Sequence, residues 1–530
     1  MSEQRHSKLF LLKPLIEKWP AVTKPEGHVA FRTKIFWTLL CLVLYFILTK
    51  ILLYGVSQTQ LDVFAGFRAI LAGASGSVMH LGIGPIVTGS IIMQLFTGAK
   101  IINLDLTKKE DKAIYQGSQK IIVMIMILVE AIPQVFGFLA PDDLFIVNIQ
   151  EGWGIGGGAA EGWANTFIVL QLSLGALVVF LMDELISKWG IGSGISLFIA
   201  AGVAEQIFTG TFSWLPAVNA DQPLNPVNNP PAGTLPKVWY VFTQRSIGSL
   251  VYQGGFEDVF LGNQAFPNPV IALVGTILIF FFVVYAESSR IELPLAHGKV
   301  RGARGRYPIR LLYASNIPVI LMAALLANIN LFALLFTTHP VFSKTPLIGG
   351  AWWVGIYPPN QTVPIGGGAW YFTTIAGVQE WLLPMFDFDR YGAILQGHTL
   401  WQLGIRVLIY LGLFIGGSVL FAKFWIETTN MGPEAVAKQI QKSGMQIPGF
   451  RRDPRVLGRI LERYIPTVTV IGGAVVGGLA AIADMIGTTG QSSGTGVLLT
   501  VGIIIRLYEQ IAKEQAMEMH PVLRGFFGAD

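Results

Sequence analysis

Acidic residues inside apolar segments are the positions of this chain that could do chemistry. They are Glu130, Asp183, Glu184, Glu205 and Asp484. A carboxyl group within a membrane costs free energy, so it usually serves ion transport or a specific partner. Lys188 follows Glu184 by four residues, which predicts an ion pair on one helix face. Asp484 and Glu205 fall near segment ends, where we expect water, so only Glu130 is deep enough to suggest a function.

Motifs of enzymes and metal sites are absent from the sequence. It contains no P-loop and no HExxH, its seven histidines are scattered, and its one cysteine, Cys41, lies in an apolar run. The glycines of 190–194 resemble a phosphate loop, but they join two apolar segments rather than a strand and a helix. We therefore expect no enzymatic activity, no metal and no cofactor.

The composition is typical of an integral membrane protein. Of the 530 residues 52% are hydrophobic and only 13% are charged, whereas soluble domains carry about 25% charged residues. The first apolar run, 35–55, is longer than the core of a cleavable signal peptide. Before it, Leu15 and Ile16 lie beside Lys13, which predicts a short helix on the membrane surface.

Ten apolar segments are long enough to be membrane spans. They are 35–55, 78–97, 119–139, 164–186, 193–209, 269–288, 311–335, 402–426, 466–486 and 495–514. Lys and Arg concentrate before the first span and after spans two, six and eight, and residues 290–310 alone hold six. Segment 140–163 holds none, and 210–268 and 336–401 hold two each. Because basic loops stay in the cytosol, both termini are predicted to be cytosolic.

Five spans in each half place the halves in opposite orientations, which predicts an inverted repeat. The predicted units are an N-terminal half, an external loop, and a C-terminal half with one external and two cytosolic loops. The N-terminal half is 1–210, the external loop after it is 211–268 and the C-terminal half is 269–530. Within the C-terminal half, the external loop is 336–401 and the cytosolic loops are 289–310 and 427–465. Gly473 and Gly477 are spaced for close helix packing. The basic residues of these loops could serve to orient the chain in the membrane and to bind anionic lipids. Alternatively, they could bind phosphate-rich RNA.

The stretch 61–97 organises the predicted bundle. Residues 63–71 form a helical pattern too short to cross a membrane, small residues follow at 73–77, and a second apolar segment runs from 78 to 96. Broken backbone at membrane depth is tolerated only where it is buried in protein or lines a watery cavity. The break therefore predicts a path through the middle of the bundle.

Four stretches resemble the SecY family, which forms the centre of the Sec protein-conducting channel. They are LGIGPIVTG (81–89), DELISKWGIGSGISLFIAAGV (183–203), VVYAESSRIELPLAHGKVRGARGRYPIRLLYASNIPVIL (283–321) and GTGVLLTVGIIIRLYEQ (494–510). The similarity favours the archaeal and eukaryotic branch. It implies an all-α fold of ten transmembrane helices in two inverted halves around a central pore, with a half-length plug helix at about 63–73.

The resemblance also implies roles for individual residues. The plug would contain Val63, Phe64, Phe67, Arg68, Ile70 and Leu71. An apolar pore ring would consist of Ile83, Val87, Ile195, Ile199, Ile320 and Leu499. A polar cluster at a lateral gate between spans 2–3 and 7–8 would hold Thr88, Glu130 and Asn328. Cytosolic docking would use Arg301, Arg304, Arg306, Arg451 and Arg452.

The partners implied by the family are two small membrane subunits (SecE/gamma and beta), the ribosome, signal peptides, nascent polypeptides and the lipid bilayer. The expected location is the cell membrane, or the endoplasmic reticulum membrane of a eukaryote. Two other hypotheses stay open on the residues alone: a secondary transporter with an inverted-repeat core, and a non-conducting scaffold that binds RNA or ribosomes. Asn360 begins a glycosylation sequon in a predicted external loop.

Overall fold

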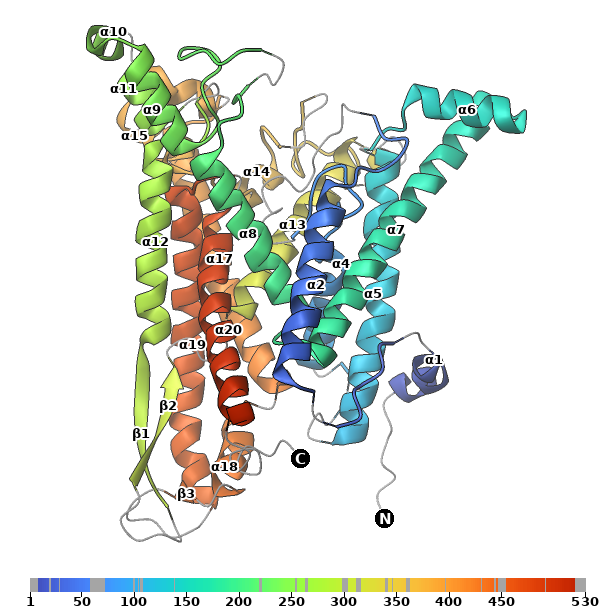
Figure 1. The fold of residues 1–530 in the computed structure, drawn as a ribbon, viewed down its shortest axis with the longest axis vertical. Helices are drawn as coiled ribbons and strands as arrows, with labels where there is room; N and C mark the ends of the chain where they lie inside the picture. Colours follow the sequence, from blue (N-terminus) through green and yellow to red (C-terminus); the bar gives the residue numbers. More distant parts are fainter. Residues whose placement is uncertain are drawn as a thin grey trace.

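The computed structural model describes residues 8–519 with short gaps. The gaps are 19–20, 28, 58–71, 99–100, 103, 105–107, 138, 219–221, 253–254, 263–265, 298–303, 311–315, 339–341, 346, 359–362, 396, 430, 443–444, 447–453 and 491. All six residues predicted for the plug, and Asn360, lie outside the described residues. The rest is a bundle of long helices with short elements at both ends (Figure 1).

Nine helices in the described part of the chain are long and apolar enough to cross a membrane. They are α2 (Phe31–Lys50), α5 (Lys109–Gly137), α7 (Gly157–Trp189), α8 (Gly194–Phe212), α12 (Val270–Ser288), α13 (Ile317–Thr338), α17 (Leu400–Thr428), α19 (Pro454–Ile486) and α20 (Gly494–Met519). A further helix of 15 residues, α4 (Gly84–Gly98), occupies the second predicted span. The helices match the ten predicted spans in order, which confirms the predicted fold class.

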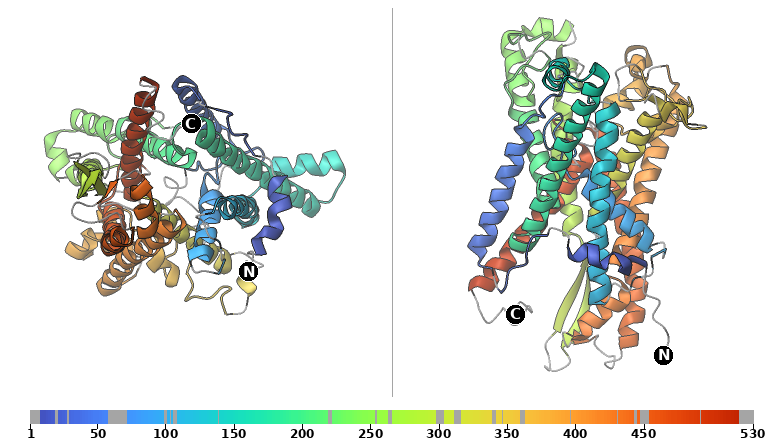
Figure 2. Two further views of the ribbon diagram at one scale, coloured as in Figure 1. Left: turned by 90° about the horizontal axis from the view of Figure 1, so that it is seen from below. Right: turned by 90° about the vertical axis from the view of Figure 1, so that its right-hand side faces the viewer.

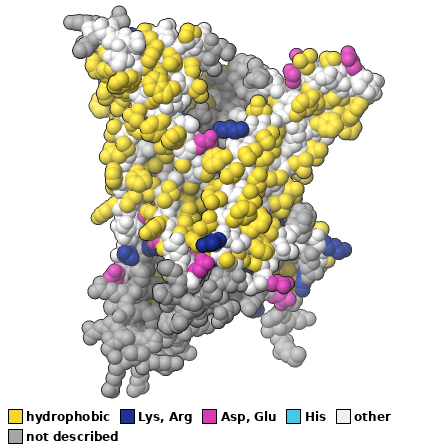
Figure 3. Space-filling model, in the orientation of Figure 1, with side chains coloured by type: hydrophobic (Ala, Val, Ile, Leu, Met, Phe, Trp, Pro, Cys, Tyr) yellow, Lys and Arg dark blue, Asp and Glu magenta, His cyan; other side chains and the backbone are white. Residues whose placement is uncertain are grey.

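Exposed apolar side chains cover the outside of the bundle. On α12, for example, Leu278 is 60% and Phe281 is 66% exposed, and hydrophobic side chains spread over the face shown in Figure 3. Such a surface is unfavourable in water and fits the hydrocarbon of a bilayer. The chain is therefore a multi-pass membrane protein.

The two halves of the chain lie side by side. Seen from below, the N-terminal helices α2, α4, α5 and α7 form one group and the C-terminal helices α12, α17, α19 and α20 another (Figure 2). The halves meet where α8 packs on α20 and where α4 packs on α13 and α17. One large hydrophobic cluster extends through both halves. Within the second half, α19 approaches α17 closely at Gly477, where a Cβ atom would lie 2.4 Å from the carbonyl oxygen of Phe414.

Two aspartates at equivalent places in the halves each hold the start of the next helix. Asp183, near the end of α7, accepts a hydrogen bond of 2.9 Å from the N–H of Ile195 in the first turn of α8. Asp484, near the end of α19, accepts one of 2.9 Å from the N–H of Thr495 in the first turn of α20. Both α8 and α20 begin with a glycine, whose Cβ would lie within 2.6 Å of the preceding helix backbone. The halves thus share one structural contact, in which an aspartate of one helix binds the first turn of the next.

A small sheet, which the sequence analysis did not predict, lies below the helical bundle. Strand β1 (Arg290–His297) pairs antiparallel with β2 (Arg304–Arg310), and β1 also pairs with the two-residue β3 (Met445–Gln446). The sheet thus joins the two loops predicted to be cytosolic. It lies beside α18 (Pro433–Lys442), at the same end of the bundle as α1 (Lys13–Glu17) and the last turns of α20 (Figure 1).

Short helices form the opposite end of the molecule. They are α6 (Asp143–Trp153), α9 (Thr234–Gln244), α10 (Ile247–Tyr252), α11 (Gly255–Leu261), α14 (Gly368–Phe372), α15 (Leu383–Phe386) and α16 (Phe388–Tyr391). Arg406 of α17 anchors part of them: its guanidinium lies 4.8 Å from the ring centroid of Trp370, which stacks on His398 at 3.8 Å. The loop predicted as external is therefore firmly attached to a spanning helix.

Candidate functional site

Residues 72–83 form a buried, non-helical segment that leads into α4. Gly76 and Gly82 adopt left-handed φ angles of 65° and 54°, which glycine tolerates best. The N–H of Gly76 donates to Nδ1 of His80 at 3.0 Å, and the Tyr45 hydroxyl donates to the carbonyl oxygen of Ala72 at 3.2 Å. This confirms that the predicted break at 73–77 is not helical. These turns delay the start of the helix from the predicted residue 78 to residue 84.

A cavity of about 280 Å³ adjoins the start of this segment. Residues 72–75 form one side of the cavity, and polar side chains of α2 and α8 form the others. Among them, Lys50 pairs with Glu205 at 2.7 Å between Nζ and Oε1. The broken backbone therefore lies beside a cavity that polar side chains help to line.

The six residues predicted for the pore ring belong to, or pack against, the large hydrophobic cluster that extends through both halves. Ile83 directly precedes α4 and Val87 lies in its first turn, while Ile195 and Ile199 come from α8, Ile320 from α13 and Leu499 from α20. Five of them are buried, and Ile195 is partly buried. Four segments far apart in the sequence thus contribute aliphatic side chains to one cluster.

The three residues predicted for the lateral gate are all buried and come from α4, α5 and α13. Nδ2 of Asn328 donates to Oγ1 of Thr88 at 3.1 Å. The hydroxyl of Thr88 also faces the carboxyl group of Glu130, which is 2% exposed. The structure therefore brings these polar groups together between α4, α5 and α13, where each half meets the other.

The predicted docking arginines are only partly described. Arg304 and Arg306 belong to β2, where their backbones pair with Ala296 and Pro294 of β1. Arg301, Arg451 and Arg452 lie outside the described residues. An antiparallel hairpin is a more rigid support for basic residues than an open loop, since its backbone groups are paired.

The remaining acidic residues are held by structural contacts. Glu184 binds Lys188 at 2.7 Å, as predicted, and it also binds Lys120. The expectation that Asp484 faces water is wrong. Its side chain is 4% exposed and accepts hydrogen bonds from the hydroxyls of Tyr410 at 2.8 Å and Thr495 at 2.7 Å, because α17 and the start of α20 enclose it.

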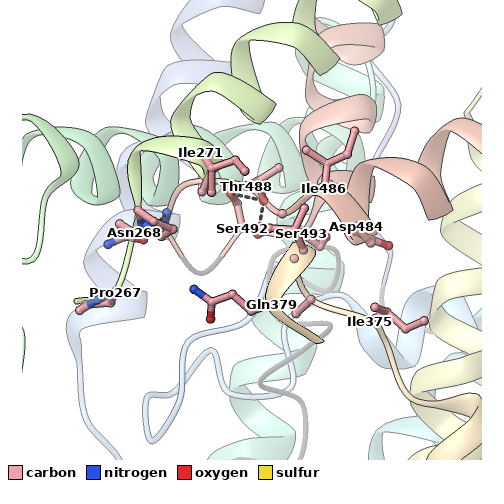
Figure 4. A pocket seen from close by; sticks show the side chains of 18 of the residues that line it. Pro267, Asn268, Ile271, Ile375, Gln379, Asp484, Ile486, Thr488, Ser492 and Ser493 are labelled. Carbon is pink, nitrogen blue, oxygen red and sulfur yellow. Dashed lines mark hydrogen bonds between the residues drawn. The ribbon is translucent and has the colours of Figure 1, made fainter. Parts of the chain in front are cut away.

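A larger cavity, of about 430 Å³, lies at the opposite end of the bundle from the sheet and was not predicted. Its walls come from the start of α12, from residues 374–379 and from the connection between α19 and α20 (Figure 4). Oδ1 of Asn268 accepts from the N–H of Gly490 at 2.7 Å, and the Ser492 hydroxyl donates to the carbonyl oxygen of Thr489 at 2.6 Å. No local sequence pattern could indicate this cavity, because three distant segments form it.

Comparisons with known proteins agree along nearly the whole chain. The family model SecY matches residues 77–508, and the model described as the plug domain of Sec61p matches residues 43–76. The protein translocase subunit SecY of Haloferax volcanii is 44% identical over 98% of this chain and 99% of its own length. That of Archaeoglobus fulgidus is 41% identical over 98% of both chains.

Solved structures show the same fold. One, described as the structure of a protein conducting channel, matches with a TM-score of 0.71 and 36% identity, over 96% of this chain and 98% of its own. Another, Sec61 in a canine ribosome–channel complex, matches with a TM-score of 0.68 and 35% identity, over 96% and 98% of the two chains. On this agreement of sequence, helix order and three-dimensional structure, the chain belongs to the SecY family.

Proposed function

We propose that this chain is the central pore-forming subunit of a protein-conducting channel. It passes unfolded secretory polypeptides across a membrane and releases hydrophobic segments sideways into lipid. The relatives are named as protein translocase subunits, and a similar structure is described as a protein-conducting channel. The chain is a channel subunit and not an enzyme. The observation that carries the proposal is that the aliphatic residues predicted for the pore ring, which come from α4 and the residue before it, α8, α13 and α20, all belong to or pack against one hydrophobic cluster that extends through both halves.

The pore ring would work by excluding water. Its members are Ile83, Val87, Ile195, Ile199, Ile320 and Leu499, all of which are aliphatic. A constriction of such side chains repels water and therefore blocks ions, while the side chains can still part around an extended polypeptide. In the closed state the plug at about 63–73 would seat against this ring from the outside.

Lateral release would occur between α4 and α5 on one side and α13 and α17 on the other. Opening there breaks the hydrogen bond between Asn328 and Thr88 and exposes the polypeptide to lipid. Each Leu or Ile then gains about 0.3–0.6 kcal/mol at the membrane centre, and each Arg or Asp loses about 2.5–3.5 kcal/mol. Roughly 20 apolar residues therefore leave sideways, whereas a polar sequence continues through the pore.

The partners of this channel would be the two small membrane subunits, SecE/gamma and beta, together with signal peptides and nascent polypeptides. The ribosome would dock on loops 289–310 and 427–465, whose arginines suit ribosomal RNA. In support, one similar structure is described as part of a ribosome–channel complex. With the basic loops in the cytosol, both termini are cytosolic, and the membrane is the cell membrane, or that of the endoplasmic reticulum in a eukaryote.

Ion conductance tests the proposed function. We expect Ile83, Ile195 and Ile320, replaced together by Ser, to make vesicles that contain the full chain leak ions, because polar side chains let water fill the constriction. Ile482→Ser is the matched control, since Ile482 lies on the outside of α19 and is 49% exposed. An unchanged conductance in the triple variant, with the protein correctly inserted, would contradict the proposal.

A further inference from the structure

Helices α6 and α7 form a corner at the end of the bundle opposite the sheet (Figure 1). Helix α6 ends at Gly154, whose φ of 62° lies in the left-handed region, and the chain then reverses so that α7 packs against α6. Ile149 of α6 is buried in this contact. The start of α6 is also held, because the N–H of Asp142 donates to the carbonyl oxygen of Gly55 at 2.9 Å. Helix α6 is therefore a fixed part of the molecule.

Three aromatic side chains gather at this corner. They are Trp153, the last residue of α6, and Trp163 and Phe167 of α7. The ring centroid of Trp153 lies 5.4 Å from that of Trp163 and 5.9 Å from that of Phe167. The two tryptophans are nevertheless 52% and 49% exposed. Contacts within the described residues therefore cover only one side of this aromatic cluster.

The exposed side of the aromatic cluster continues into an apolar stripe on α7. Trp163, Leu170, Leu174 and Val178 are 39–54% exposed, and their spacing places them on one face of the helix. Figure 3 shows hydrophobic side chains along α7 up to the lower side of α6, with acidic side chains above them. This stripe belongs to the surface that fits the hydrocarbon of a bilayer, so the aromatic cluster lies at one end of a lipid-facing surface.

The length of α7 places the aromatic cluster at the boundary of the hydrocarbon. Near the other end of the helix, Glu184 binds Lys120 and Lys188, and such a group of charges is costly inside a membrane. Trp163 precedes Glu184 by 21 residues, which is about 32 Å along a helix axis. The hydrocarbon core of a bilayer is about 30 Å thick. With the charges at one boundary, the aromatic cluster therefore lies at the other.

The charges of this region do not suit a basic-patch attachment to anionic lipids. Segment 140–163 contains no Lys or Arg, and Asp143, Glu151 and Glu161 are exposed. Tryptophan, by contrast, combines a large apolar ring with a polar N–H group, and it is enriched where hydrocarbon meets water. The side chains of the corner thus fit the interface through their rings and not through their charge.

We propose that Trp153, Trp163 and Phe167 anchor the corner of α6 and α7 in the water–lipid interface of the membrane. The partner of this surface is the bilayer itself and not another protein. Because α7 also packs on α5, the anchor holds the ends of both helices at one depth.

Single nitroxide labels test this contact in neutral phosphatidylcholine vesicles that contain the full chain. Cys41→Ala first removes the native thiol. Thr166→Cys then places a label beside the aromatic cluster with every ring intact, since Thr166 is exposed and its hydroxyl donates to Gly162 of the same helix. Leu174→Cys is the hydrocarbon reference, and Val227→Cys, 47% exposed in a turn, is the aqueous reference. We expect the ratio of oxygen to nickel-complex accessibility at Thr166 to lie between the two references.

Removal of the rings supplies the second measurement. With Trp153→Ser and Trp163→Ser together, the ratio at Thr166 should fall toward the aqueous reference. The matched control is Trp239→Ser, which removes a tryptophan that is 67% exposed on α9 and should leave the ratio unchanged. A ratio at Thr166 equal to the aqueous reference, with all rings present, would overturn the inference even if the double variant failed to insert. So would a ratio that does not change in a correctly inserted double variant.

Discussion

The contact of α19 with α17 at Gly477 allows a stability prediction with a built-in control. In Gly477→Ala the new Cβ would lie 2.4 Å from the carbonyl oxygen of Phe414 and 2.8 Å from Oγ of Ser418. Because ordinary contacts are near 3.5 Å, the two helices must separate by roughly 1 Å. Overpacking of this kind costs about 2 kcal/mol, and it stretches the 2.8 Å bond between Tyr410 and Asp484 that joins the same helices.

The variant Gly478→Ala separates the cost of overpacking from the gain in helix preference that alanine brings. A Cβ there would meet nothing closer than 3.7 Å, so Gly478→Ala gains only the helix preference of alanine, about 1 kcal/mol. With about 1 kcal/mol lost from the stretched hydrogen bond, we expect Gly477→Ala to be less stable than Gly478→Ala by about 3 kcal/mol. Thermal unfolding of both purified variants in detergent measures this difference. Equal stabilities would refute the packing argument.

Three further perturbations have defined outcomes. Asp484→Ala leaves buried donors unpaired and should lower the free energy of unfolding in detergent by about 3 kcal/mol. A change below about 0.5 kcal/mol is typical of a surface residue and would contradict the buried role of Asp484. Burial lowers the pKa of Lys237 in α9 to about 7, so the unfolded chain holds the extra proton between pH 7 and about 10, and stability rises across that window. Lys237→Met should abolish this rise, which melting curves at several pH values test. Glu184→Gln weakens two ion pairs and the bond from Val22, so hydrogen exchange of residues 21–27 should accelerate.

Much of the membrane bundle could be predicted because apolar length and loop charge are local properties. The ten spans, the break at 73–77 and the pair of Glu184 with Lys188 all follow from short-range patterns. The start of α4 could not be placed, because left-handed turns at Gly76 and Gly82 replace what would otherwise be its first turns. Hydropathy does not distinguish a buried turn from a buried helix.

The features that could not be predicted depend on contacts between segments that are distant in the sequence. Asp484 looked water-exposed since it lies two residues from the end of α19, but Tyr410 and Thr495 come from other helices and enclose it. Likewise, the β1–β2 hairpin was not predicted, because its many arginines made the segment look like a basic loop. The pore and gate residues were identified only through the family resemblance, because nothing in their local spacing sets them apart from other aliphatic or polar side chains.

The matching aspartates of α7 and α19 have an evolutionary consequence. Each holds the start of the helix that follows it, one at the sheet end of the bundle and one at the opposite end, so the contact works in either orientation. A five-helix ancestor that entered the membrane both ways round would have carried this contact in every copy and could pair with itself as an antiparallel dimer. Gene duplication and fusion of such an ancestor would leave the two carboxylates where they now stand.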